Sequence, residues 1–202
     1  GRAIAEAFAA HGAKVVVSSR KAPKCEEVAA SINTDYGEAI AVPCNISRID
    51  ELRALVDRTL EHWGRIDVLV CNAAVNPYYG PLVELDEGAY AKTMDSNVKS
   101  NLWLCNMVIP QMAEREDGAV IITASIGGLK GTGNLGLYAI TKAADMQLAR
   151  SLAVEWGPKN IRVNCLAPGI IRTDMARLLW EDPAAYDKAI KKYPLGRIGE
   201  PE

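Results

Sequence analysis

The stretch EHWGRIDVLVCNAA, residues 61–74, shows the pattern that decides the fold. Its first residues close an amphipathic helix predicted over about 48–63, and Gly64 follows as a stop signal. A nearly continuous apolar run then predicts a buried strand over 65–73, which ends in the small and polar tip Asn72-Ala73-Ala74. The rest of the chain follows the same order of helix and strand.

Alternating periodicity extends over most of the sequence. We predict strands at 13–19, 38–44, 65–73, 118–125 and 160–168, and helices at about 3–12, 22–36, 48–63, 96–115 and 136–157. A loop rich in Pro, Tyr and Gly precedes the helix at 96–115. Near-continuous apolar strands between amphipathic helices indicate a parallel sheet that is covered on both faces. The predicted fold class is therefore α/β, a doubly wound Rossmann-type sheet in one domain over 1–202.

Composition excludes several classes of function. The net charge is −2 and no basic run occurs, which argues against a nucleic-acid partner. No apolar stretch reaches the roughly 20 residues of a membrane span. The five cysteines form no CxxC motif, so we expect reduced thiols in a cytoplasmic compartment and neither disulfides nor a zinc site. Both histidines precede glycines at predicted helix ends, which leaves little for a metal site or histidine catalysis.

Both ends of the sequence suggest a longer natural protein. The first residues, GRAIAEAF, already begin a helix, and the last ones, GRIGEPE, form a charged loop. A dinucleotide-binding unit needs a strand and a glycine turn before that first helix. We therefore expect the domain to be truncated at both ends, without its first strand and glycine turn and without its C-terminal strand.

Small and polar residues stand at the ends of four of the predicted strands. They are Asn45, Asn72, Ser125 and the pair Pro168-Gly169. Because ligands bind open α/β sheets at the carboxyl ends of the strands, these residues predict a binding edge. Tyr138 and Lys142, one helical turn apart in YAITK, begin the helix that follows Ser125.

These residues resemble the short-chain dehydrogenase/reductase family. Ser125 with Tyr138-x-x-x-Lys142 is similar to its Ser–Tyr–Lys core, GRAIAEAF to the end of its glycine turn, CNAAV to its NNAG motif, SNVKS to its asparagine motif and RVNCLAPGIIRT to its PG motif. CNAAVNPYYGPL and RVNCLAPG also resemble the NADP-dependent carbonyl/retinol reductase branch. Cys71 and Ala74 replace the Asn and Gly of NNAG, and Asn45 stands where many members have Asp.

The resemblance implies hydride transfer between a nicotinamide cofactor and a carbonyl or secondary alcohol. It implies that Tyr138 is the general acid/base and that Ser125 hydrogen-bonds the substrate oxygen. It also implies that Lys142 binds the nicotinamide ribose hydroxyls and that Asn97 holds a water in a proton relay. The expected cofactor contacts are Gly1, Ser19, Arg20, Asn45, Ile46, Asn72, Ala73, Ala74, Tyr138, Lys142, Pro168, Gly169, Ile171 and Thr173.

The spacing of Tyr138 and Lys142 supports an electrostatic role. Residues i and i+4 of a helix lie about 5–6 Å apart. A unit charge at about 5 Å, with an effective dielectric constant near 20, is worth roughly 3 kcal/mol. On that basis we expect Lys142 to lower the pKa of Tyr138 from about 10 to about 7.5–8.

The end of the strand at 13–19 predicts the choice of cofactor. Members that use NAD place an acid at this point, where it pairs with the ribose 2′-hydroxyl. Here the residues are Ser18-Ser19-Arg20, and an arginine favours a 2′-phosphate. We therefore expect NADP(H) to be preferred over NAD(H).

The expected substrate is a small apolar carbonyl compound or alcohol. The segment 174–193 resembles the family's substrate lid, and its Leu178, Leu179 and Trp180 are expected to line an apolar pocket with Tyr78, Tyr79 and Leu137. The helices at 96–115 and 136–157 carry apolar residues on more than one face, and in this family such helices pair between subunits. We therefore expect a homo-oligomer, a dimer or a homotetramer.

Two other functions stay open. One is a non-catalytic, cofactor-binding member that serves as a redox sensor or scaffold, although an intact Ser–Tyr–Lys set disfavours it. The other is a Tyr-x-x-x-Lys epimerase or dehydratase, which needs a larger C-terminal substrate domain.

Overall fold

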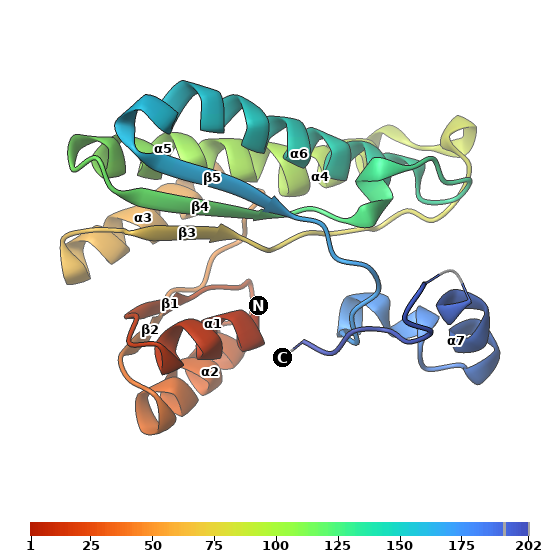
Figure 1. Ribbon diagram of the computed structural model, residues 1–202, viewed down its shortest axis with the longest axis horizontal. Helices are drawn as coiled ribbons and strands as arrows, with labels where there is room; N and C mark the ends of the chain where they lie inside the picture. The colour runs from red at the N-terminus through yellow and green to blue at the C-terminus, as the bar shows by residue number, and fades with distance from the viewer. Residues whose placement is uncertain (192, 202) are drawn as a thin grey trace. The chain divides into compact units, whose positions relative to one another are not determined.

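The computed structural model describes residues 1–191 and 193–201. They form two compact units, Gly1–Ala167 and Pro168–Glu202, and each is described by itself. The first unit contains two parallel sheets with their helices, and the second contains a short helical segment (Figure 1).

The smaller sheet lies in the N-terminal part of the first unit. Two helices and two strands alternate there, namely α1 (Arg2–Ala10), β1 (Val15–Val17), α2 (Ala22–Asp35) and β2 (Ala39–Ala41). The strands pair in parallel with Val15 opposite Ala39. Apolar side chains from α1, α2 and β2 form a small core of their own, with Ile32 fully buried at its centre.

The larger sheet has the order β3-β4-β5, and all of its strands are parallel. Its strands are β3 (Val68–Cys71), β4 (Gly118–Thr123) and β5 (Ile161–Leu166). Two long helices, α5 (Ser100–Glu114) and α6 (Gly136–Trp156), lie side by side against one face of this sheet (Figure 1). The main core lies between the sheet and these helices, where Val120 and Ile122 of β4 are fully buried.

Local chemistry sets the ends of the remaining helices of this unit. Helix α3 (Ile49–Trp63) ends at Gly64, whose φ of 75° is the left-handed conformation that glycine adopts freely. Helix α4 (Glu87–Met94) begins at Asp86, whose carboxylate accepts a hydrogen bond from the Ala89 amide. A π-helical turn, η2 (Asp95–Lys99), then leads into α5. Three short 3₁₀ helices lie in the loops: η1 (Leu82–Glu84), η3 (Ile126–Leu129) and η4 (Gly157–Lys159).

The second unit contains η5 (Asp174–Leu179) and α7 (Pro183–Ile190). Asp182 caps α7 by accepting a hydrogen bond from the Ala185 amide. A single parallel bridge joins Ile171 to Gly199. These two helices fall within the predicted lid at 174–193, of which residue 192 lies outside the described residues.

The predicted fold class is confirmed, with three differences. The strands form two sheets rather than one, since no strand of the described residues pairs with both β1 and β3. On β5, Arg162, Asn164 and Leu166 are exposed, so the described residues do not cover that face as predicted. The loop predicted before residue 96 contains α4, a short helix with a weak apolar stripe.

Candidate active site

Ser125 stands at the end of β4, where the chain turns into η3. Its Oγ accepts a hydrogen bond from the Gly127 amide at 3.0 Å. The next residue, Gly128, packs on the backbone of α6, because a Cβ there would lie 2.7 Å from the Lys142 carbonyl carbon and from the Ala143 nitrogen. The missing side chain therefore lets the Ser125 loop lie directly on the first turns of α6.

Tyr138 and Lys142 occupy the first two turns of α6. The Lys142 Nζ lies 5.8 Å from the centre of the Tyr138 ring. The Ser125 hydroxyl lies close enough to the Tyr138 phenol to lower its pKa. The structure thus brings together the three side chains that the sequence singles out.

The Lys142 ammonium group is almost fully enclosed, with a residue exposure of 1%. Its Nζ donates to the Thr123 carbonyl oxygen and to the Asp145 Oδ2, both at 2.8 Å. A lysine has three N–H donors, so these two bonds leave one for a ligand.

Asp145 is a member of the site that the sequence analysis missed. Its side chain is fully buried, and its Oδ1 accepts a hydrogen bond from the Asn101 amide nitrogen at 2.8 Å. The same Asn101 nitrogen donates to the Asn97 carbonyl oxygen, also at 2.8 Å. A carboxylate three residues after a lysine on a helix is a signal for an ion pair, and YAITKAAD contains that signal.

The lowered pKa predicted for Tyr138 is wrong. The pKa of Tyr138 is raised above its usual value, chiefly because burial disfavours the phenolate. The nearby Ser125 hydroxyl opposes this rise, while the negative charge of Asp145 adds to it. The prediction failed because it counted the attraction of Lys142 but left out burial, which disfavours the phenolate, and the negative charge of Asp145.

Asn97 lies in the π-helical turn and is completely buried. Its Oδ1 accepts a hydrogen bond from the Val75 amide at 2.8 Å. Its side-chain nitrogen donates to the Val75 carbonyl oxygen at 2.9 Å and to the Thr141 hydroxyl at 3.1 Å. Asn97 therefore ties the loop after β3 to α6. π-Helical turns often occur at functional sites, and the water relay predicted for Asn97 stays a prediction.

Ser19 and Arg20 line a hollow of about 440 Å³ at the end of β1, together with Lys21. Ser19 accepts a hydrogen bond from the Lys21 amide at 3.2 Å, and its hydroxyl also contacts the Cys25 thiol at 3.1 Å. No ion pair of the described residues involves Arg20 or Lys21. Both positive charges are thus available to an anion.

Gly1 lies against the tip of β3. A Cβ on Gly1 would come within 3.3 Å of the Asn72 amide nitrogen. Helix α1 starts at Gly1 without a side-chain cap, so its first backbone N–H groups can donate hydrogen bonds to an anionic ligand. Beyond Asn72, Ala73 is exposed and Ala74 is half-buried.

Asn45 and Ile46 are engaged in local structure. The Asn45 Oδ1 accepts hydrogen bonds from the amide and the hydroxyl of Ser47, which shapes the turn after β2. Ile46 packs against the main core. The Asn45 backbone N–H also donates to the Glu51 Oε2 at 2.7 Å, and its carbonyl oxygen accepts from the Arg48 amide at 2.9 Å, so the Asn45 side-chain nitrogen and the backbone of Ile46 are what these two residues offer the adenine end of a cofactor.

Pro168, Gly169, Ile171 and Thr173 belong to the second unit. There the Arg172 amide donates to the Gly199 carbonyl oxygen, and the Gly199 amide donates to that of Ile170, both at 2.9 Å. The Trp180 indole N–H donates to the Thr173 carbonyl oxygen at 3.0 Å. The cofactor contacts predicted for these residues remain predictions.

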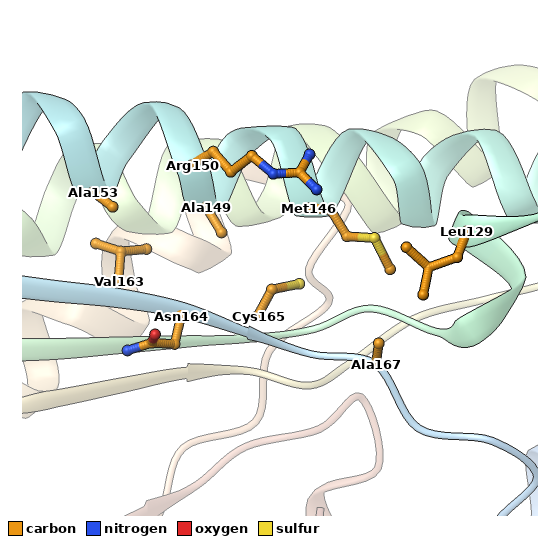
Figure 2. A pocket seen from close by; sticks show the side chains of 9 residues that line it. All are labelled: Leu129, Met146, Ala149, Arg150, Ala153, Val163, Asn164, Cys165 and Ala167. Atoms are coloured by element: carbon orange, nitrogen blue, oxygen red, sulfur yellow. The ribbon is translucent and has the colours of Figure 1, made fainter.

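A second hollow, of about 330 Å³, lies between α6 and β5 (Figure 2). Arg150 is the one charged residue among its mainly apolar lining, and Ser125, Tyr138 and Lys142 are not part of that lining. Nor are Tyr78, Tyr79 and Leu137, which were predicted to line a substrate pocket. Tyr79 is 68% exposed and Leu137 is buried in the packing of α6, and their contact with substrate stays a prediction.

Known proteins show which family this arrangement belongs to. A family model described as enoyl-(acyl carrier protein) reductase matches residues 1–202. Dehydrogenase/reductase SDR family member 4 of Oryctolagus cuniculus is 39% identical over 202 residues, covering 100% of this chain and 78% of the relative. The chain belongs to the short-chain dehydrogenase/reductase family. It is an NAD(P)-dependent oxidoreductase.

Solved structures of this family have the same fold. A short-chain type dehydrogenase/reductase from Mycobacterium ulcerans matches with a TM-score of 0.95 and 27% identity, over 100% of this chain and 74% of that one. A gluconate 5-dehydrogenase from Burkholderia cenocepacia J2315, in complex with NADP and tartrate, matches with a TM-score of 0.92 and 26% identity, over 100% and 79% of the two chains.

Within residues 1–191 and 193–201, no group of three or more His, Cys, Asp or Glu side chains could hold a metal ion. In those same residues, no helix has the length and apolar character needed to cross a membrane.

Proposed function

We propose that the protein transfers a hydride between NADP(H) and a small apolar carbonyl compound or secondary alcohol, with Tyr138 as the general acid/base. The observation that carries this proposal is the convergence of Ser125, Tyr138 and Lys142 at the end of β4. A phenol and a hydroxyl close together, with an ammonium group near the phenol ring, can hold a substrate oxygen and exchange a proton with it.

The three side chains divide the work at the substrate oxygen. Ser125 donates a hydrogen bond that holds the oxygen beside the Tyr138 phenol. Tyr138 gives its proton to this oxygen in carbonyl reduction and removes one in alcohol oxidation. Because its pKa is raised, Tyr138 is protonated at neutral pH, which suits the reductive direction.

The residues of this chain fit a dinucleotide. When bound, the nicotinamide supplies or accepts the hydride. The uncapped start of α1 at Gly1 offers amides to the pyrophosphate, and the free N–H of Lys142 suits the ribose hydroxyls. Arg20 and Lys21 at the hollow after β1 support a preference for NADP(H), because both favour a 2′-phosphate.

Oligomerisation and compartment belong to the same proposal. Leu102 and Trp103 on α5, and Ile140 and Val154 on α6, are exposed apolar residues that a homodimer or homotetramer would cover. Light scattering would test this assembly. All five cysteines are free thiols and four are buried, which supports a reducing compartment such as the cytoplasm.

Replacing Tyr138 by phenylalanine tests the proposal. Tyr138→Phe removes the proton donor and should lower kcat for NADPH-dependent ketone reduction by about 10²–10⁴-fold. NADPH binding, measured by calorimetry, should persist. Tyr90→Phe makes the same chemical change at an exposed tyrosine of α4 and should leave the rate unchanged. Retained turnover in Tyr138→Phe would refute the proposal. If wild type binds NADPH but reduces no compound in a panel of ketones and aldehydes, a non-catalytic role is favoured.

A further inference from the structure

A buried chain of polar groups runs behind the catalytic residues. The Lys142 ammonium group contacts Asp145 Oδ2, Asn101 contacts Asp145 Oδ1, and Asn101 also contacts the Asn97 carbonyl oxygen, each at 2.8 Å. The side chains of Lys142 and Asp145 are 2% and 0% exposed. An ion pair this well enclosed is screened little by water or salt.

Nothing in the mechanism proposed above requires a carboxylate here. Ser125, Tyr138 and Lys142 can perform the proton transfer without Asp145, and burying a carboxylate has a large desolvation cost. Two features offset that cost, namely the contact with Lys142 and the hydrogen bond from Asn101. The pair is therefore a specific arrangement whose removal should change the chemistry of Tyr138 as well as the packing.

We propose that Asp145 is a positioning residue that holds the Lys142 ammonium group at the Thr123 carbonyl and offsets its charge at the Tyr138 phenol. This inference rests on the proposed function, in which Tyr138 exchanges the proton. Asp145 thereby determines how much of the Lys142 charge acts on Tyr138.

The surroundings of the pair support this assignment. Asp145 acts on Tyr138 and raises its pKa, in the direction expected of a nearby negative charge. Burial raises the pKa of Asp145 itself, and the contacts with Lys142 and Asn101 oppose that rise. The other titratable groups around the pair are the thiols of Cys71 on β3 and Cys165 on β5. Cys105 of α5 lies beside Cys71, and the positive charge of Arg150 acts on Cys165.

The same charge also acts on these thiols. Burial chiefly raises the pKa of Cys165, the Asp145 charge adds to that rise, and Lys142 and Arg150 act in the opposite direction. The pKa of Cys71 is likewise raised, chiefly by its hydrogen bond with Cys105 and by burial. Both thiols therefore stay neutral near pH 7, so Asp145 is the charged group whose effect on the phenol is resolved.

Asp145→Asn tests the inference without depending on turnover. In protein with ¹³C-labelled tyrosine, NMR follows the chemical shift of the Tyr138 ring carbon that bears the hydroxyl as the pH is changed. The signal that disappears in Tyr138→Phe is the one from Tyr138. Removing the negative charge should shift the titration midpoint to lower pH by about one unit. Glu155→Gln removes an exposed carboxylate from the same helix and should not move the midpoint.

A second variant keeps the test decisive if Asp145→Asn does not fold. Asn101→Ala keeps the ion pair but removes the hydrogen-bond donor that offsets part of the Asp145 negative charge, so more of that charge should act on the phenol and the Tyr138 midpoint should shift to higher pH. The midpoint of alcohol oxidation against pH should follow the NMR midpoint in each variant.

The outcomes separate this inference from the proposed function. An unchanged Tyr138 midpoint in folded Asp145→Asn would overturn the inference. If that variant does not fold, an unchanged midpoint in Asn101→Ala would do the same. A loss of stability without a shift of the midpoint would show that Asp145 has a purely structural role. Retained turnover in Tyr138→Phe would instead overturn the proposed function, whatever the NMR midpoints show.

Discussion

At the scale of single residues, Tyr138 is subject to opposing influences. Burial and the Asp145 carboxylate raise its pKa, whereas the nearby Ser125 hydroxyl lowers it. Ser125, Tyr138 and Lys142 could be predicted because their types and spacing form a motif. The ion pair could not be found in the same way, because that motif does not include Asp145 and only its packing against α5 shows that it is buried.

Arg20 provides a prediction at this scale. If its guanidinium binds the 2′-phosphate, wild type should prefer NADPH to NADH in kcat/KM, and Arg20→Glu should lose about 10–100-fold with NADPH, which corresponds to a charged hydrogen bond of about 1.5–3 kcal/mol. The rate with NADH is the internal control, since NADH has no 2′-phosphate. A wild type that prefers NADH would contradict the assignment.

At the scale of elements, the predicted helices at 96–115 and 136–157 correspond to a π-turn with α5 and to α6. Their apolar content made them visible in the sequence. Helix α4 was missed because it has eight residues and one buried side chain, Thr93, so its cap at Asp86 was the main signal. The π-turn at Asn97 was missed because it depends on contacts with Val75 and Thr141, far away in the sequence.

The contact between η3 and α6 predicts the effect of a single methyl group. Gly128→Ala would place a Cβ 2.7 Å from backbone atoms of Lys142 and Ala143, and backbone cannot move aside as a flexible side chain can. We expect a loss of about 1–3 kcal/mol in the free energy of unfolding, measured with denaturant, because overpacking forces the loop outward. The displaced Ser125 should also lower kcat.

Gly131→Ala is the matched control for this change. Gly131 lies in the same loop, has no positive φ, and a Cβ there would have nothing within 4 Å. Its stability should be unchanged or slightly higher, because alanine restricts the unfolded chain. Equal stability of the two variants would show that the Ser125 loop does not pack on α6 as described.

At the scale of the whole molecule, the order of strands and helices was sufficient to predict the α/β class, and the family match agrees with it. The division into two sheets was not predicted, because local periodicity identifies strands but not their partners. Residues 168–202 form a unit of their own, so their predicted contacts with the cofactor depend on how that unit packs in the working enzyme.

The central claim is that the protein transfers a hydride at the Ser125–Tyr138–Lys142 site. It is tested most directly with NADPH deuterated at either face of nicotinamide C4 and an apolar ketone, with mass spectrometry of the alcohol formed. The account predicts deuterium on the carbinol carbon from one labelled face only, and almost no alcohol from Tyr138→Phe. Alcohol that carries no deuterium from either labelled face would contradict it. So would an amount of deuterated alcohol from Tyr138→Phe equal to that from wild type.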